Sequence, residues 1–168
     1  MSLLALLQTC CLIAFALLLL LGAWQDVRTL HIADAVSMAI VSAFLVWGLG
    51  GLAHSSVSLS GLSWSVACAA GVFGVGALAF AAGTFGGGDV KLLTASSLFA
   101  GPTLMLDFLT VTVLAGGVLG LAALAAAPTG LARTGADTKV RARLRRGLPY
   151  GPAIAAGGLW VAGVLAMT

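Results

Sequence analysis

Residues 91–127 form a long and mainly apolar run, KLLTASSLFAGPTLMLDFLTVTVLAGGVLGLAALAAA. A helix that crosses a bilayer needs about 20 apolar residues, so this run is too long for one span and short for two. Gly101-Pro102 interrupts it. Proline removes a backbone donor and disfavours helix in the residue before it. We therefore expect a short helix over 89–100 and a longer one over 103–127, with a break between them.

The rest of the chain has the same apolar character. Its 168 residues are 61% hydrophobic and 8% charged, with a mean hydropathy of +1.14. A soluble domain carries about a quarter charged residues, and disordered chains are poor in apolar residues, so both classes are excluded. What remains is an all-α polytopic membrane protein with about six transmembrane helices in a single domain, 1–168. The expected spans are 3–24, 35–53, 62–82, 89–100, 103–127 and 152–166, with a hydrophilic loop at 128–148.

The basic residues support six spans. With that number, the first, third and fifth loops share one side of the membrane. These three loops hold all eight basic residues: Arg28, Lys91, Arg133, Lys139, Arg141, Arg143, Arg145 and Arg146. The positive-inside rule then places the three loops in the cytoplasm. The net charge of +3 therefore reports topology and contact with anionic membrane lipids, and we expect no nucleic-acid partner.

Two aspartates occupy the same membrane boundary in this topology. Asp26 ends the first span and Asp89 starts the fourth. Ionisable groups at membrane depth are costly and by default mark function. Two carboxylates in a partly dry site cannot both ionise easily, so one stays protonated while the other remains a base. Aspartic proteases use such a pair to activate water and to protonate the peptide carbonyl. The alternative is that each is an ordinary solvated residue at the interface.

The sequence offers no good metal site, and we expect no cofactor. His31 and His54 fall in loops on opposite sides of the membrane. The three cysteines, Cys10, Cys11 and Cys68, lie in apolar runs and form no C-x-x-C pair. Clusters of His and Cys ligands are what a protein zinc site needs.

A glycine triplet, Gly86-Gly87-Gly88, immediately precedes Asp89. Glycine lets the backbone approach another segment closely and permits positive φ, and an extended peptide beside such a segment is held by main-chain hydrogen bonds. The triplet is therefore a candidate substrate-binding segment. A flexible turn between two spans would have the same composition.

Three segments of the chain resemble the signature segments of the type IV prepilin peptidases, which are membrane aspartic proteases with a G-x-G-D motif. They are DVR at 26–28 followed by IAD at 32–34, GGGDVKLL at 86–93, and PYGPAIAAG at 149–157. Their order and spacing match the family over most of the chain. One departure is Ala33-Asp34, where the family more often has Pro-Asn, and we expect it to alter the start of the second helix more than the chemistry.

The resemblance implies that Asp26 and Asp89 are the catalytic pair. They would cleave the leaders of type IV prepilins and pseudopilins at the cytoplasmic face of a bacterial inner membrane. Bifunctional members also carry a domain with two C-x-x-C pairs and N-methylate the trimmed pilin. Because no C-x-x-C occurs here, the chain is more similar to the short Flp/Tad-type form, and we expect no N-methyltransferase activity. The pilus secretion machinery would be a further partner.

Supporting or substrate-binding roles fall to Gly86–Gly88, Lys91, Arg28 and Tyr150. Lys91 and Arg28 are equally well explained as topology markers, and Tyr150 as an interfacial anchor. The rival function is a small ion- or proton-coupled transporter, and a third is a non-catalytic subunit of a secretion assembly. Transporters favour carboxylates near the bilayer midplane and repeated halves. Here both carboxylates lie at one boundary and the halves are dissimilar, so the peptidase is favoured.

Overall fold

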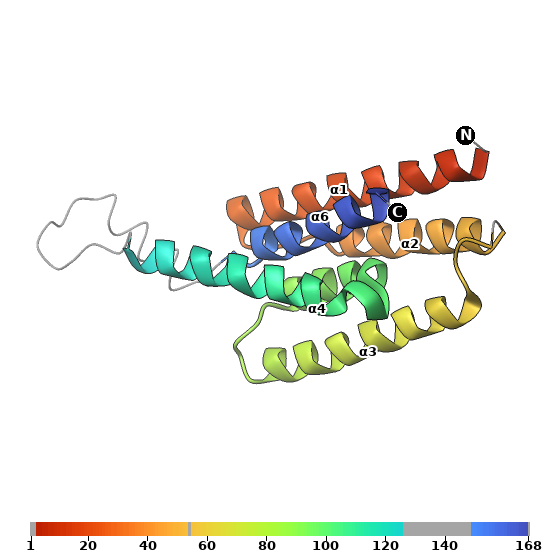
Figure 1. Ribbon diagram of the computed structural model, residues 1–168. Helices are drawn as coiled ribbons and strands as arrows, with labels where there is room; N and C mark the ends of the chain where they lie inside the picture. Colours follow the sequence, from red (N-terminus) through yellow and green to blue (C-terminus); the bar gives the residue numbers. More distant parts are fainter. Residues whose placement is uncertain (1–2, 54, 126–148, 168) are drawn as a thin grey trace, which may run out of the picture.

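The computed structural model describes residues 3–53, 55–125 and 149–167. Nearly all of them are helical, in α1 (Leu3–Thr29), α2 (Asp34–Ala53), α3 (Leu59–Ala81), α4 (Gly87–Ala125) and α6 (Gly151–Met167) (Figure 1). The first four helices are long and apolar enough to cross a bilayer, and α6 is a shorter apolar helix. The expected class, an all-α membrane protein, is confirmed.

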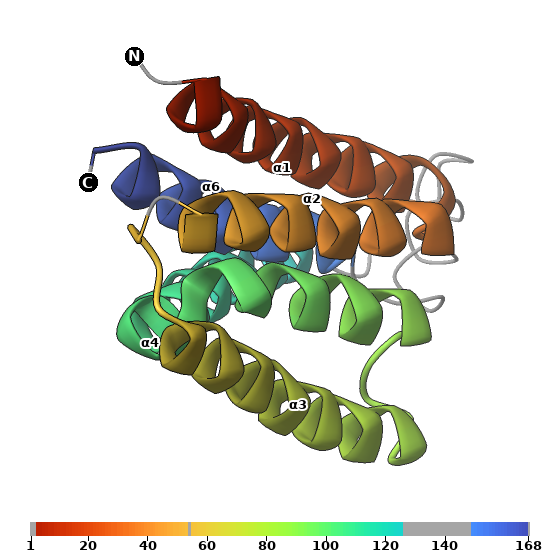
Figure 2. The same ribbon diagram turned by 90° about the vertical axis from the view of Figure 1, so that its right-hand side faces the viewer.

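Helix α4 consists of two helical segments joined at a sharp break. Gly101 has φ 54° and ψ −167°, outside the helical region, and Pro102 follows it. The chain reverses direction there, so the first half of α4 (87–100) and the second half (102–125) run in opposite directions (Figures 1 and 2). A glycine tolerates this positive φ because it has no Cβ. The described residues therefore form six helical segments.

The reversal in α4 makes the segments alternate in direction. One end of the bundle, which we call the site end, gathers the end of α1, the start of α2, the end of α3, both ends of α4 and the start of α6 (Figure 1). The connection from α2 to α3 and the break at Gly101 lie at the opposite end. Arg28 and Lys91 belong to the site end. The expected hydrophilic loop at 128–148, with its six basic residues, falls outside the described residues.

Helix α4 is the centre of the packing. It contacts α2, α3 and α6, and α1 packs against α2 and α6. Three buried aromatic rings meet between these helices: the Phe15 and Phe99 rings are stacked with centroids 4.2 Å apart, and Phe44 meets Phe99 edge-on at 5.4 Å. Large apolar side chains also cover the outside, such as Leu106, which is 78% exposed. An outer surface this apolar suits lipid as its solvent.

Helix α1 extends beyond the predicted boundary at residue 24 and ends at Thr29. The polar residues after the apolar run continue the helix, and the backbone N–H of Leu30 donates to the carbonyl of Asp26 at 2.8 Å. Leu30 then adopts φ 53° and ends the helix. The side chain of Gln25 accepts from the backbone N–H of Ala33 at 3.1 Å, tying the turn to α1. Asp26 therefore lies on a rigid helix and not in a loop.

Candidate active site

Asp26 is held by the start of α6. Its side chain is buried, with 4% of the residue exposed, and its Oδ2 accepts a hydrogen bond from the backbone N–H of Gly151 at 2.6 Å. Gly151 is the first residue of α6, where backbone N–H groups have no partner within the helix and the helix dipole favours negative charge. The carboxylate of Asp26 thus has a fixed main-chain partner.

The close approach of α6 to Asp26 requires glycine at position 151. A Cβ added there would lie 2.7 Å from the Cβ of Asp26 and 2.9 Å from its Oδ2. Non-bonded carbons are normally about 3.5–4.0 Å apart, so any side chain at this position would displace the carboxylate. The segment Pro149-Tyr150-Gly151 was singled out as a motif, but the sequence assigned no role to Gly151.

Asp89 is held by the turn that precedes α4. It is the third residue of that helix and is partly buried, and its carboxylate is hydrogen-bonded by the backbone N–H of Gly86. The N–H of Val90 in turn donates to the carbonyl of Gly86 at 3.1 Å. An acidic residue at the third helical position that reaches back to the capping residue is half of a capping box. A Cβ on Gly86 would lie 2.7 Å from Oδ2 of Asp89.

The two carboxylates lie at the same end of the bundle, close enough for the charge of Asp26 to act on Asp89. Glycine contacts bring their helices together. A Cβ on Gly88 would lie 3.3 Å from Cβ of Ile32 in the α1–α2 turn. A carboxyl pair of this kind can supply one base and one acid to the same reaction.

An aromatic pair links the two segments that hold the carboxylates. The rings of Phe85 and Tyr150 are stacked with centroids 5.1 Å apart and planes 18° from parallel. Phe85 precedes the amide of Gly86, and Tyr150 precedes the amide of Gly151. The stack therefore joins the turn that binds Asp89 to the one that binds Asp26. The sequence analysis did not predict a role for Phe85. Its position directly before the glycine triplet was the only feature of the sequence that could have indicated one.

The two predicted basic residues make other contacts. The ammonium group of Lys91 lies 2.7 Å from both carboxylate oxygens of Asp34. Asp34 is the first residue of α2, and its carboxylate is bound by Lys91. The Arg28 guanidinium lies over the ring of Trp24, 4.1 Å from its centroid. The structure thus gathers Asp26, Asp89, the glycine turn and Tyr150, while the amine of Lys91 is directed to Asp34.

Within the ranges that the structure describes, no group of three or more His, Cys, Asp or Glu side chains is placed to hold a metal ion. The hydrogen-bond donors that bind the two aspartates are the backbone amides of Gly151 and Gly86.

The fold and this site define a class: a helical membrane protein with two aspartates at one end of the bundle, each bound by an amide at the start of a helix. The sequence model of the type IV leader peptidase family matches residues 13–121. This match covers well over half of the chain and includes both aspartates, and the chain belongs to that family. The search of curated proteins and the search of solved structures each returned no match. The family confirms the resemblance and identifies the chain as a leader-peptidase-like protease.

Proposed function

We propose that this chain is an aspartic endopeptidase that removes the leader peptides of Flp/Tad-type prepilins and pseudopilins, with Asp26 and Asp89 as its catalytic pair. The observation that carries the proposal is the placement of both carboxylates at the site end, within electrostatic reach of each other, with Asp26 buried and hydrogen-bonded by Gly151 at 2.6 Å. Membership in the type IV leader peptidase family supports the reaction class.

The chemistry needs only water and the two carboxyl groups. The ionised carboxylate takes a proton from water as the oxygen attacks the scissile carbonyl, and the protonated carboxyl group donates its proton to the carbonyl oxygen. The tetrahedral intermediate then collapses and the C–N bond breaks. The leaving amine takes a proton from the carboxyl that gained one, and a hydroxyl of the intermediate returns its proton to the other carboxylate. The hydrogen bonds from Gly151 and Gly86 keep the two groups oriented through this cycle.

The placement in the membrane is part of the proposal. The site end would face the cytoplasm of a bacterial inner membrane, with anionic lipids and the pilus secretion machinery as neighbours. The 168 residues contain three cysteines but no C-x-x-C pair, the feature that marks the N-methylating members. We therefore propose peptidase activity alone for these residues. A reporter fused near Thr138, outside the described residues, should then read cytoplasmic. A periplasmic signal from that fusion would contradict this orientation.

The catalytic assignment is tested by co-expression with a Flp-type prepilin. Asp26→Asn and Asp89→Asn should each slow leader cleavage by about 10²–10⁴-fold, the usual contribution of a positioned acid or base. Asp107→Asn is the matched control, because this exposed aspartate follows the break at the opposite end of the bundle. Wild-type cleavage by either site variant, at normal levels in the membrane, would refute the assignment.

A further inference from the structure

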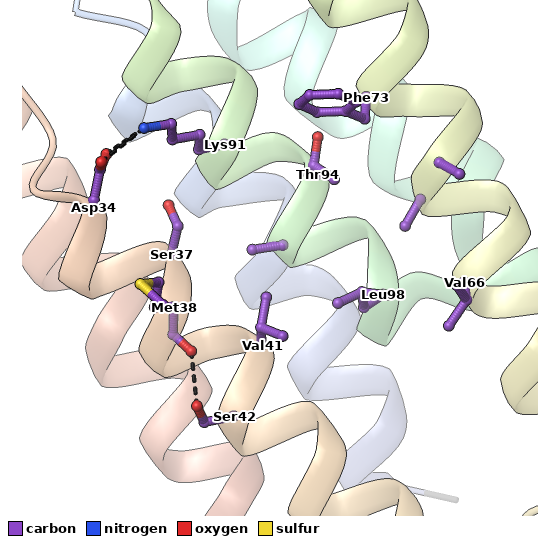
Figure 3. Close-up of a pocket in the computed structure, with 13 residues that line it drawn as sticks. Asp34, Ser37, Met38, Val41, Ser42, Val66, Phe73, Lys91, Thr94 and Leu98 are labelled. Carbon is purple, nitrogen blue, oxygen red and sulfur yellow. Dashed lines mark hydrogen bonds and ion pairs between the residues drawn. The ribbon is translucent and has the colours of Figure 1, made fainter.

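A groove opens between α2 and α3, with the first half of α4 as its floor (Figure 3). Its volume is about 720 Å³, and its walls are largely apolar, with Met38 and Val41 from α2, Val66 and Phe73 from α3, and Leu98 from α4. Along α4 it runs from Lys91 to Leu98, which is about two helical turns or 10 Å. Phe73 and Val66 line the face of α3 that looks toward α2 (Figure 3). The groove lies within the length of the helices and so at membrane depth.

The groove contains a buried hydroxyl group without a partner. Ser37 lines it and is 7% exposed, and among the described residues its Oγ is a buried side-chain oxygen with no hydrogen bond. Buried polar groups are normally hydrogen-bonded, and an unsatisfied one calls for an explanation. The neighbouring hydroxyl of Ser42 donates to the carbonyl of Met38 at 2.9 Å (Figure 3). Ser37 therefore offers a donor to whatever fills the groove.

The polar end of the groove lies at the site end of the bundle, where α2 and α4 begin. The ion pair of Asp34 and Lys91 forms its polar end (Figure 3), and Lys91 follows Asp89 by two residues. Below the ion pair the lining becomes apolar, apart from a few hydroxyl groups. The groove therefore changes from a polar end to an apolar interior. This change is complementary to a polypeptide that passes from a polar segment to an apolar helix at the membrane boundary.

We propose that this groove binds the apolar helix of the membrane-anchored substrate while its leader crosses the site end to Asp26 and Asp89. The inference rests on the proposed function. Small side chains in the walls, Ala69, Ala70 and Ala95, allow a helix to approach closely, as in helix pairs in lipid. A carbonyl of that helix can accept a second hydrogen bond from the Ser37 hydroxyl. A lipid acyl chain has no acceptor for Ser37, so the groove favours a helix.

The first test fills the groove and compares two substrates. Ala70 is exposed and lines the groove, whereas Ala67 is exposed on the same helix outside it. Ala70→Trp should reduce cleavage of a membrane-anchored prepilin by about tenfold, because the indole occupies space that the helix needs. It should cleave at the wild-type rate a short peptide that spans the scissile bond and ends before the apolar segment. Ala67→Trp should cleave both substrates as the wild type does.

The outcomes separate the groove from the catalytic assignment. If Asp26→Asn and Asp89→Asn leave cleavage of the short peptide intact, the proposed function fails. If those variants are inactive while Ala70→Trp cleaves the anchored prepilin normally, the groove proposal alone fails. Equal loss of both substrates in Ala70→Trp would also overturn it, because the defect would then not concern the substrate helix.

A second test identifies the occupant directly. Met38 lines the groove and is 69% exposed, and Leu49, on the same helix, is 67% exposed and lies outside it. A photoreactive amino acid at Met38, in the Asp89→Asn background and in membranes that contain the prepilin, should cross-link to the apolar segment of the prepilin. The same amino acid at Leu49 should not. A Met38 adduct with lipid alone, or equal prepilin adducts from both positions, would overturn the proposal.

Discussion

Gly151→Ala is the sharpest test of how the catalytic pair is held. The added Cβ would lie 2.7 Å from Cβ and 2.9 Å from Oδ2 of Asp26. Because Asp26 is 4% exposed and sits on a helix, it has little room in which to retreat. Either the carboxylate turns away or the start of α6 moves outward, and both changes break the 2.6 Å hydrogen bond from the Gly151 N–H.

The size of the effect follows from the geometry. Restoring an ordinary contact of about 3.5–4.0 Å requires a displacement of roughly 1 Å. A misplacement of about 1 Å in an active site can cost on the order of 10²-fold in rate, which corresponds to about 2.7 kcal/mol of activation free energy. We therefore expect kcat for leader cleavage to fall by about two orders of magnitude. KM for the anchored prepilin should stay unchanged, because the groove is not altered.

The assay is cleavage of a prepilin by purified variants in proteoliposomes, with two glycine controls on the same helix. At Gly163 an added Cβ meets nothing within 4 Å, so Gly163→Ala should behave as the wild type. At Gly158 it would lie 2.5 Å from Cδ1 of Leu19, so Gly158→Ala should lower the thermal midpoint with less effect on kcat. Near-normal kcat in Gly151→Ala would refute the positioning role. The positioning role would also be refuted if kcat fell in proportion to the loss of stability in both Gly151→Ala and Gly158→Ala.

Three further predictions concern the break, the aromatic pair and the ion pair. Gly101→Ala should destabilise the protein by about 1–3 kcal/mol, because a backbone with φ 54° and ψ −167° is almost exclusive to glycine. Thermal unfolding in detergent measures this change, and a midpoint equal to that of the control Gly117→Ala would contradict it. Tyr150→Phe should retain leader cleavage and Tyr150→Ala should lose it, because stacking on Phe85 needs only the aromatic ring. Loss of cleavage in Tyr150→Phe would instead assign a role to the hydroxyl group. Lys91→Gln should leave the thermal midpoint unchanged because exposed ion pairs contribute little, and a large drop would show that the pair holds α2 against α4.

The outline of the fold follows from local sequence signals. Gly101-Pro102 indicates a break because its backbone cannot continue a helix, and the chain reverses there. Two spans separate Asp26 from Asp89, so the two aspartates must lie at the same end of the bundle. Both inferences depend only on span lengths and on the chemistry of two residues.

The parts that the sequence did not reveal are those that depend on distant contacts or on polar helix ends. Hydropathy ends the first span near residue 24, but backbone hydrogen bonding continues through the polar residues to Thr29. Gly151 lies 125 positions from Asp26, and no local pattern shows that its amide meets that carboxylate. Lys91 is close to Asp89 in sequence, but residues two apart on a helix point to different faces.

Backbone amides, and not charged side chains, orient the two aspartates. The small number of charged residues in the chain explains why. A membrane protein with 8% charged residues has few side chains with which to hold two carboxylates in place. Backbone N–H groups at helix starts are available at no cost in charge, since they have no intrahelical partner. Glycine is what lets them approach a carboxylate, as Gly86 and Gly151 do. Substitutions at these two glycines should therefore impair cleavage more than loss of either nearby cation, Arg28 or Lys91, and kcat measured for the four alanine variants would rank them.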